Sequence, residues 1–352
     1  MVAYNPLPRP EAFMAIAALF AKRSKDPVTQ VGAVLVDKDE YVAATGYNGF
    51  PAKLSDDHFS WLKTGEHRHD KKYPYVKHAE LNVLANVTRT YDGGTLYVTV
   101  MPCHDCAREI VQLQQKIRCV KFISVYENGK DSNVTANDMF NSAGIPITTL
   151  EARVKNVSVD FDLLDVESRE IAPRVSLTGK RLDYLPWEET FMGAAMIMAQ
   201  CSKNPVYQQG AVLVGPKNKT LGFGYNGIPK RISAKLKAEN KTFDWSNAKL
   251  REEYEIKGAN NCMLNSSRVP NSTLYTTHFP DIAATHKLLE TDVKKVIFGH
   301  APDKNSSDII AAKRMMDHAE IKYQQFRAAT NKIDIDLATR DVTFPGLRFK
   351  SE

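Results

Sequence analysis

Several short segments of this sequence recur about 178 residues later, and this internal repeat constrains the fold more than any other feature. The recurring pairs are 24–28 (SKDPV) with 202–206 (SKNPV), 32–36 with 210–214 (GAVLV in both), and 46–51 (GYNGFP) with 224–229 (GYNGIP). A weaker match near the ends relates 157–162 to 332–336. Because repeated sequence indicates repeated structure, we expect two copies of one domain. The predicted boundaries are 1–165 for the first copy, 166–185 for a linker and 186–352 for the second copy.

Each copy has the pattern of an α/β domain. In the first copy we expect helices over 11–24 and 133–143, further helices beginning near residues 78 and 103, and a long polar loop over 49–76. The expected strands cover 32–36, 41–46, 96–100, 119–125 and 145–149. Strands that alternate with helices predict a layered α/β fold, and with 43% apolar residues each copy can bury a core.

Two motifs in the first copy contain metal-ligand chemistry. His78 stands two residues before Glu80, and Cys103 and Cys106 form a Cys-x-x-Cys pair directly after Pro102. Catalytic zinc sites typically have three protein ligands and keep the fourth position for water. The same motif pair is typical of the zinc nucleobase deaminases, in which the glutamate is the general acid and base. We therefore predict one catalytic Zn²⁺ held by His78, Cys103 and Cys106, with Glu80 as the catalytic residue.

Both motifs are expected at the start of a helix. Pro102 suits a helix start because it has no N–H to lose there, and the positive helix end favours the thiolates that zinc needs. Residues two apart on a helix do not face each other, so His78 and Glu80 can meet one water only near the mouth of their helix.

Two alternatives compete with the catalytic interpretation: a redox cysteine pair and half of a structural zinc site. The remaining cysteines, Cys119, Cys201 and Cys262, form no second Cys-x-x-Cys. A histidine among His58, His67, His69 and His104 could in principle complete a structural site. A structural site has no use for an acid such as Glu80, which favours catalysis.

The second copy lacks the zinc motifs. Aligning 76–80 with 256–260 places Gly258 at the histidine and Asn260 at the glutamate. Aligning 102–106 with 280–284 places Asp281 and Ala284 at the two cysteines. We therefore expect one catalytic metal per chain.

The first copy resembles the deoxycytidylate (dCMP) deaminases of the cytidine deaminase superfamily. The resemblance rests on 22–27 (KRSKDP), 46–51 (GYNGFP), 72–82 (KYPYVKHAELN), 102–106 (PCHDC) and 140–144 (FNSAG), and it spans about residues 10–165. It implies tandem three-layer α-β-α domains, each with a mixed sheet of about five strands. It also implies deamination of dCMP to dUMP and ammonia, which supplies dUMP for thymidylate synthesis.

The same resemblance implies substrate contacts. The Ala79 N–H would bind the base carbonyl, Asn48 the sugar, and Ser24 and Lys25 the phosphate. A plain turn around Asn48, and a helix end at Ser24 and Lys25, are the structural alternatives.

Members of that family are commonly activated by dCTP and inhibited by dTTP at subunit contacts. Ser202, Lys203 and Asn226 in the second copy therefore form a candidate effector site, with Mg²⁺ accompanying the nucleotide. A pure packing scaffold is the alternative, and we expect a homo-oligomer whose assembly differs from that of single-domain relatives.

Composition narrows the remaining classes. The formal charge of +6 is compatible with anionic small molecules or nucleic acid, and the basic residues read as dispersed, which argues against a nucleic-acid surface. No apolar run reaches a membrane span, a signal-peptide core is not evident, and five cysteines without framework spacing indicate a reducing compartment. We expect a cytoplasmic protein, with the nucleus as the alternative. The competing activities are dCTP deamination and, with less support, editing of cytosine or adenine in nucleic acid.

Overall fold

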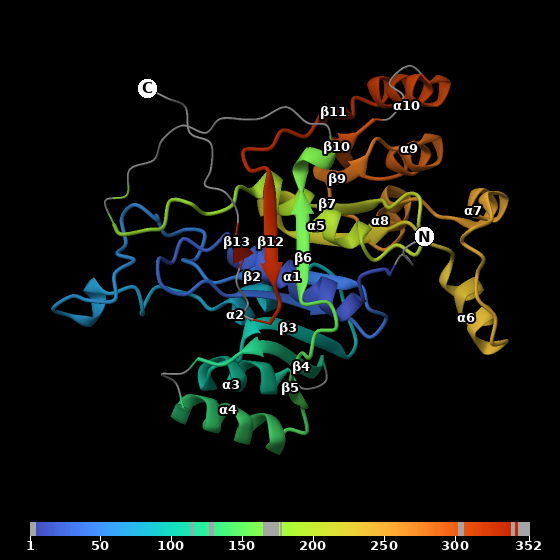
Figure 1. The fold of residues 1–352 in the computed structure, drawn as a ribbon. Coiled ribbons are helices and arrows are strands. Elements are labelled where there is room, and N and C mark those ends of the chain that lie inside the picture. The colour runs from blue at the N-terminus through green and yellow to red at the C-terminus, as the bar shows by residue number, and fades with distance from the viewer. Residues whose placement is uncertain are drawn as a thin grey trace. The chain divides into compact units, whose positions relative to one another are not determined.

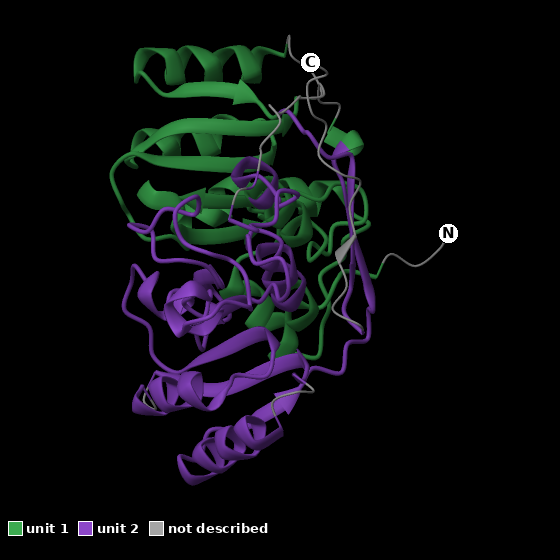
Figure 2. Cartoon of the chain, turned by 90° about the vertical axis from the view of Figure 1, so that its left-hand side faces the viewer, with its two compact units in different colours: residues 1–12, 162–167, 191–326 green, residues 13–161, 168–190, 327–352 purple. Residues whose placement is uncertain are grey.

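The computed structural model describes residues 5–113, 116–126, 130–164, 176, 178–301, 306–338 and 342–343 (Figure 1). Contacts divide the chain into two compact units (Figure 2). Unit 1 comprises residues 1–12, 162–167 and 191–326, and unit 2 comprises 13–161, 168–190 and 327–352. The predicted repeat boundaries stay a prediction, and most of the proposed linker, residues 165–175 and 177, lies outside the described residues.

Unit 2 contains a five-stranded mixed sheet in the order β2-β1-β3-β4-β5. β1 pairs antiparallel with β2 and β3, whereas β3, β4 and β5 are parallel. The strands are β1 Gly32–Val36, β2 Val42–Tyr47, β3 Gly94–Val100, β4 Ile117–Ser124 and β5 Ile147–Thr149. The helices of this copy are α1 Arg9–Ala21, α2 Ala79–Ala85, α3 His104–Gln112 and α4 Lys130–Ser142, and the 49–76 loop contains the 3-10 turn Arg68–Asp70. The predicted elements are confirmed within a few residues.

This sheet is the middle of three layers, with helices on both of its faces. Leu35 and Val98 pack with Val83 of α2, Ile110 of α3 and Phe140 of α4 in one apolar core. On the other side α1 packs against β1, and Phe13 contacts Tyr97 of β3 with a ring separation of 5.4 Å. Residues 11–21 of α1 are buried all round, so the helix is more apolar than the amphipathic helix that we expected.

Unit 1 contains a second five-stranded sheet with the corresponding order, β11-β10-β9-β7-β8. Its strands are β7 Gly210–Val214, β8 Thr220–Tyr225, β9 Ser272–His278, β10 Val293–His300 and β11 Lys322–Gln325. The helices of this copy are α5 Trp187–Ala199, α6 Lys230–Ala238, α7 Ala248–Tyr254, α8 Gly258–Leu264, α9 Ile282–Leu289 and α10 Ser307–His318. Short 3-10 turns cover Phe161–Leu164 and Pro216–Asn218. The expected fold class, two α/β copies with five-stranded mixed sheets, is confirmed.

The weak terminal repeat has a structural meaning. β6 (Asn156–Asp160) pairs antiparallel with β12 (Lys332–Asp336), and β13 (Val342–Thr343) continues the sheet. Ser158 lies opposite Asp334 and donates a hydrogen bond to it. A strand near the end of the second copy is therefore paired with the last strand of the first copy.

Candidate active site

The metal-ligand side chains come from the starts of two helices in unit 2. His78 is the residue that precedes α2, and Cys103 is the residue that precedes α3; both have extended backbone there. Cys106 lies in the first turn of α3 and is buried. Because α3 follows directly from β3, the strand end places both cysteines opposite the start of α2.

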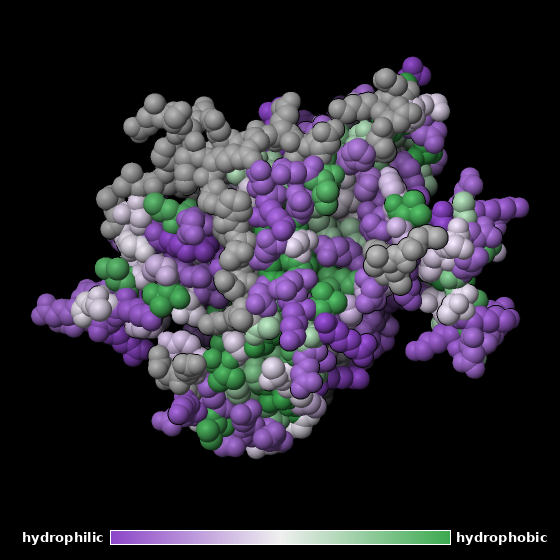
Figure 3. All heavy atoms as spheres, viewed as in Figure 1, coloured by the Kyte–Doolittle hydropathy of each residue, from purple (hydrophilic) through white to green (hydrophobic). Residues whose placement is uncertain are grey.

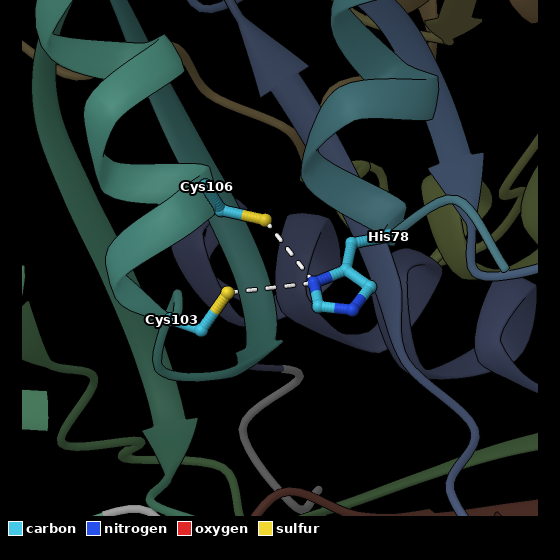
Figure 4. Close-up of side chains that lie close together, drawn as sticks. All are labelled: His78, Cys103 and Cys106. Atoms are coloured by element: carbon cyan, nitrogen blue, oxygen red, sulfur yellow. Dashed lines mark hydrogen bonds between the residues drawn. The ribbon is translucent and has the colours of Figure 1, made fainter. Parts of the chain in front are cut away.

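The three ligand atoms form a compact group (Figure 4). His78 Nδ1 lies 3.3 Å from Cys106 Sγ and 3.5 Å from Cys103 Sγ, and all three atoms lie within 4.8 Å of one another. Zinc bonds of about 2.0 Å to nitrogen and 2.3 Å to sulfur, set at a tetrahedral angle, separate N and S by about 3.5 Å. The donor types and spacing therefore fit a zinc ion. Among the described residues, this is the one such group of histidine, cysteine and carboxylate side chains.

The charges of these groups are strongly coupled. A hydrogen bond from the Cys106 thiol, with further help from His78, lowers the pKa of Cys103 to about 3. Its hydrogen bond to Cys103, together with burial, raises the pKa of Cys106. The hydrogen bond with Cys103 also raises the pKa of His78 to about 9, against the opposing effect of burial. The site thus stabilises the Cys103 thiolate beside a cationic His78 ring. A bound dication would take the place of that positive charge.

Glu80 lies in the first turn of α2 and is 4% exposed. Burial raises the pKa of its carboxyl, while the positive charge of His78 opposes the shift. Its side chain also hydrogen-bonds with Cys106, the thiol that contacts His78. Glu80 and His78 therefore both contact Cys106 near the start of α2, although these two residues do not face each other along the helix.

Comparison with known proteins agrees with this geometry. Residues 8–123 match the family model of the cytidine and deoxycytidylate deaminase zinc-binding region. Deoxycytidylate deaminase of Homo sapiens is 41% identical over 157 residues, which cover 87% of the human protein and 44% of this chain. This chain belongs to the deoxycytidylate deaminase family. The resemblance expected from the sequence is confirmed.

One further relative and one solved structure match a similar share of this chain. A probable deoxycytidylate deaminase of Drosophila melanogaster is 40% identical over 161 residues, covering 78% of that protein and 44% of this chain. A crystal structure of the dCMP deaminase from cyanophage S-TIM5 in complex with dCMP and dUMP is 29% identical, with a TM-score of 0.32, and the match covers 96% of that chain and 40% of this one.

The predicted substrate residues of this deaminase-family chain are deeply embedded. Asn48 is 5% exposed; its amide accepts from the Val31 N–H at 2.8 Å and donates to the Thr29 carbonyl at 2.9 Å. The hydroxyl of Ser24 is fully buried and accepts from the Asp26 N–H at 3.2 Å.

Lys25 and Ala79 differ from those two residues. Lys25 pairs with Asp56, and its side chain is 23% exposed. Ala79 is the first residue of α2 and is fully buried. Whether any of these residues binds substrate stays a prediction.

A buried ion pair beside Asn48 was missed by sequence reasoning. The Lys72 ammonium contacts both carboxylate oxygens of Asp26, at 2.6 Å to Oδ1, and these two side chains are 6% and 3% exposed. Asp26 also accepts from the Asn48 amide at 3.4 Å. A lysine in a polar loop gave no signal of burial, because its partner is 46 residues away in the sequence.

The structure corrects one alignment in the second copy. Asn82 of α2 donates to the Tyr47 carbonyl at 2.8 Å, and Asn261 of α8 makes the equivalent bond to Tyr225 at 2.7 Å. The isolated bridge between Gly49 and Lys77 likewise corresponds to that between Gly227 and Ile256. Both equivalences give an offset of 179 residues between α2 and α8, whereas the alignment of 76–80 with 256–260 uses an offset of 180.

With this register, Lys257 and not Gly258 occupies the place of His78, and Ala259 and not Asn260 that of Glu80. The α3 alignment is unchanged, since Asp281 precedes α9 as Cys103 precedes α3. The conclusion that the zinc ligands are lost holds with different residues: a lysine and an alanine replace the imidazole and the acid.

The candidate effector residues have the same internal roles as their first-copy equivalents. Ser202 is fully buried and accepts from the Asn204 N–H at 3.2 Å. Asn226 is fully buried and bonds Gln209, Tyr207 and Glu255. Lys203 is exposed. An effector role for these residues stays a prediction.

Across the part of the chain that the structure describes, no helix has the length and apolarity that a membrane crossing requires.

Proposed function

We propose that this protein deaminates a free deoxycytidine nucleotide by zinc-dependent hydrolysis, with dCMP as the preferred substrate and dUMP and ammonia as products. The observation that carries the proposal is the group of His78, Cys103 and Cys106 with a buried carboxyl, Glu80, against the same thiol. The deoxycytidylate deaminases among its relatives support the choice of substrate.

The chemistry divides between the metal and one acid. Bound by the three side chains, Zn²⁺ supplies a Lewis acid that lowers the pKa of water. Glu80 accepts a proton from the attacking water and delivers protons to N3 and to the leaving amine of cytosine. A C4–O bond forms and the C4–N bond breaks, so cytosine and water become uracil and ammonia. Burial raises the pKa of the Glu80 carboxyl, the direction that helps a carboxylate accept a proton.

Substrate orientation falls to the residues around this centre. We assign the base carbonyl to the Ala79 N–H at the start of α2, and the sugar and phosphate end to the segment that contains Asn48, Ser24 and Lys25. Burial of the Asn48 and Ser24 side chains supports a role in holding this segment in place. Lys25 is the more exposed of the three and can turn toward a phosphate by releasing Asp56.

The test is a substrate panel. The zinc-loaded full chain is incubated with CMP, dCMP, dCTP, deoxycytidine and a single-stranded DNA, and ammonia and uracil-containing products are measured. We expect turnover of dCMP well above that of the other compounds. Preference for dCTP would replace the proposal by dCTP deamination, and turnover of DNA alone would replace it by nucleic-acid editing.

For the second copy we propose a scaffold role. The complete internal bonding of Ser202 and Asn226 supports a packing function over nucleotide sensing. dCTP or dTTP, with or without Mg²⁺, should then leave the melting temperature and the rate curve unchanged. A shift that a Lys203→Ala substitution removes would instead establish an effector site.

A further inference from the structure

The loop that precedes α8 in the second copy contains two helices where the first copy has a largely irregular loop. α6 and α7 lie between β8 and α8, and Figure 1 shows them away from the strands of their sheet. Neither helix contributes a buried residue. Short helices without a buried face are marginal by themselves, so core packing does not explain why these two are present.

The charge of this region is concentrated. Residues 230–251, which we call the basic arm, contain seven basic and two acidic residues, a formal charge of +5, whereas the whole chain has +6. The basic residues are Lys230, Arg231, Lys235, Lys237, Lys241, Lys249 and Arg251. The impression of dispersed charge from the whole sequence is thus corrected.

The cations of α6 are exposed. Lys230, Arg231, Lys235 and Lys237 are all exposed, and the helix contains no acidic residue. Figure 3 shows mainly hydrophilic side chains over α6 and α7. The ion pairs of Lys241 with Glu239 and Lys249 with Glu253 are at the surface, where such pairs are weak. The exposed carboxylates Glu252 and Glu253 end the basic surface on α7.

Three aromatic rings lie near one another between α6 and the end of α7, and Arg251 donates a hydrogen bond to the Trp245 carbonyl. Phe243 contacts Trp245 at a ring separation of 4.8 Å and Tyr254 at 6.2 Å. Trp245 is half-buried, and Tyr254 is 41% exposed. Rings at a basic surface are suited to stacking unpaired bases.

We propose that the basic arm is a binding surface for single-stranded nucleic acid. The cations of α6 contact the phosphates, and the exposed ring of Tyr254 stacks on a base. A lipid surface fits less well, because an interfacial helix needs an apolar face to insert and the apolar residues of α6, Ile232 and Leu236, are already half-buried. This function is independent of the proposed deamination, since the arm belongs to the copy that lacks zinc ligands.

The test is fluorescence anisotropy with labelled 20-nucleotide DNA and RNA and the full zinc-loaded chain. With four phosphate contacts, the slope of log K against log salt is about −3, and affinity falls about 50-fold between 50 and 200 mM salt. Lys235→Glu/Lys237→Glu should weaken binding at least tenfold and flatten the slope. The matched control, Lys53→Glu/Lys63→Glu, makes the same charge change at exposed positions of the equivalent loop and should bind normally. Both variants should deaminate dCMP at the wild-type rate.

A second variant separates bases from mere negative charge. Tyr254→Ser should weaken oligonucleotide binding about tenfold with an unchanged salt slope, and leave heparin binding intact. The proposal is overturned if neither oligonucleotide binds at 50 mM salt, or if the control variant and not the α6 variant loses binding. Binding to phosphatidylserine vesicles without binding to oligonucleotides would assign the arm to membranes instead.

Discussion

The two copies have the same strand order and turns, and they differ at the positions of the zinc ligands and the catalytic acid. In both copies the GAVLV strand is central to its hairpin: β1 lies between β2 and β3, and β7 lies between β8 and β9. In both copies the asparagine of the GYNG turn, Asn48 or Asn226, accepts a hydrogen bond from the residue just before that strand. At the helix starts, however, His78, Glu80 and Cys106 of the first copy correspond to Lys257, Ala259 and Ala284 of the second. The framework residues satisfy packing and backbone hydrogen bonds, so they persist whether or not the centre is catalytic.

The ion pairs next to the asparagine of the GYNG turn sharpen the contrast. The pair of the first copy is buried, whereas in the second copy the Lys257 side chain is 38% exposed and its partner Glu255 is buried. In the first copy Asp26 accepts from Asn48 and pairs with Lys72; in the second, Asn204 replaces Asp26, and Glu255 accepts from Asn226 and pairs with Lys257 at 3.2 Å. The carboxylate has moved to another element, yet each copy keeps one buried carboxylate, one lysine and one asparagine. Burying an unpaired charge is costly, so the combination is retained even though its members are exchanged.

The largest expected effect comes from removing the acid that the first copy has and the second copy lacks. Glu80→Gln should lower turnover by about 10³- to 10⁴-fold, because the proton relay is lost while the zinc ligands remain. Ammonia release and zinc content measure the two effects separately. Glu109→Gln changes an exposed glutamate on α3 and should retain wild-type activity. Turnover that survives in Glu80→Gln would place the catalytic acid elsewhere.

A transplant of the ligands tests the corrected register. Lys257→His, Asp281→Cys and Ala284→Cys together should raise the zinc content from one to two ions per chain, because these positions precede or begin α8 and α9 as the natural ligands do in α2 and α3. The same triple variant with Gly258→His in place of Lys257→His should stay at one ion. Equal zinc contents in the two triple variants would refute the one-residue shift.

Acid stability should differ between the copies. Burial, with His300 and Lys257 nearby, lowers the pKa of His278 from 6.5 to about 4. The neutral ring therefore contributes its full stability above pH 6.5 and loses it as the pH falls toward 4, by up to about 3 kcal/mol. The first copy has Val100 at this place, so His278→Val should shift the acid unfolding midpoint to lower pH. Exposed His318→Asn is the control and should leave the midpoint in place. An unchanged midpoint in His278→Val would show that this histidine does not govern acid stability.

The smallest difference is expected between two glycines. A Cβ on Gly32 would lie 1.9 Å from the Ala17 carbonyl oxygen, and one on Gly210 would lie 1.8 Å from that of Ala195. Each glycine-to-alanine change should cost about 3 kcal/mol or more, because the backbone of the facing helix must move, and the two costs should agree within about 1 kcal/mol. Denaturant unfolding of both variants measures this. Clearly unequal costs would mean that the frameworks are less alike than their contacts indicate.

Much of the catalytic copy could be predicted from sequence, for a physical reason. Zinc chemistry restricts the ligand types and their spacing, so His78, Cys103 and Cys106 were identifiable before their geometry was known. The strands of the first sheet could also be located from the sequence. Such local signals depend on residues close together in the chain.

Features set by distant partners could not be predicted in the same way. The burial of Lys72 depends on Asp26, and the pairing of β6 depends on a strand more than 170 residues later. The one-residue shift in α8 arises from an extra residue in the preceding loop, which a sequence alignment can place on either side of the helix start. The helices of the basic arm lack a buried face, so apolar periodicity gave little sign of them.

The pairing of β6 with β12 has a consequence for synthesis on the ribosome. At about 5 to 20 residues per second, roughly 10 to 35 s pass between translation of the two strands. During that interval β6 is an unpaired edge, open to association with another nascent chain. The unit that contains the zinc ligands is therefore completed last, after the chain of the zinc-free copy has been made.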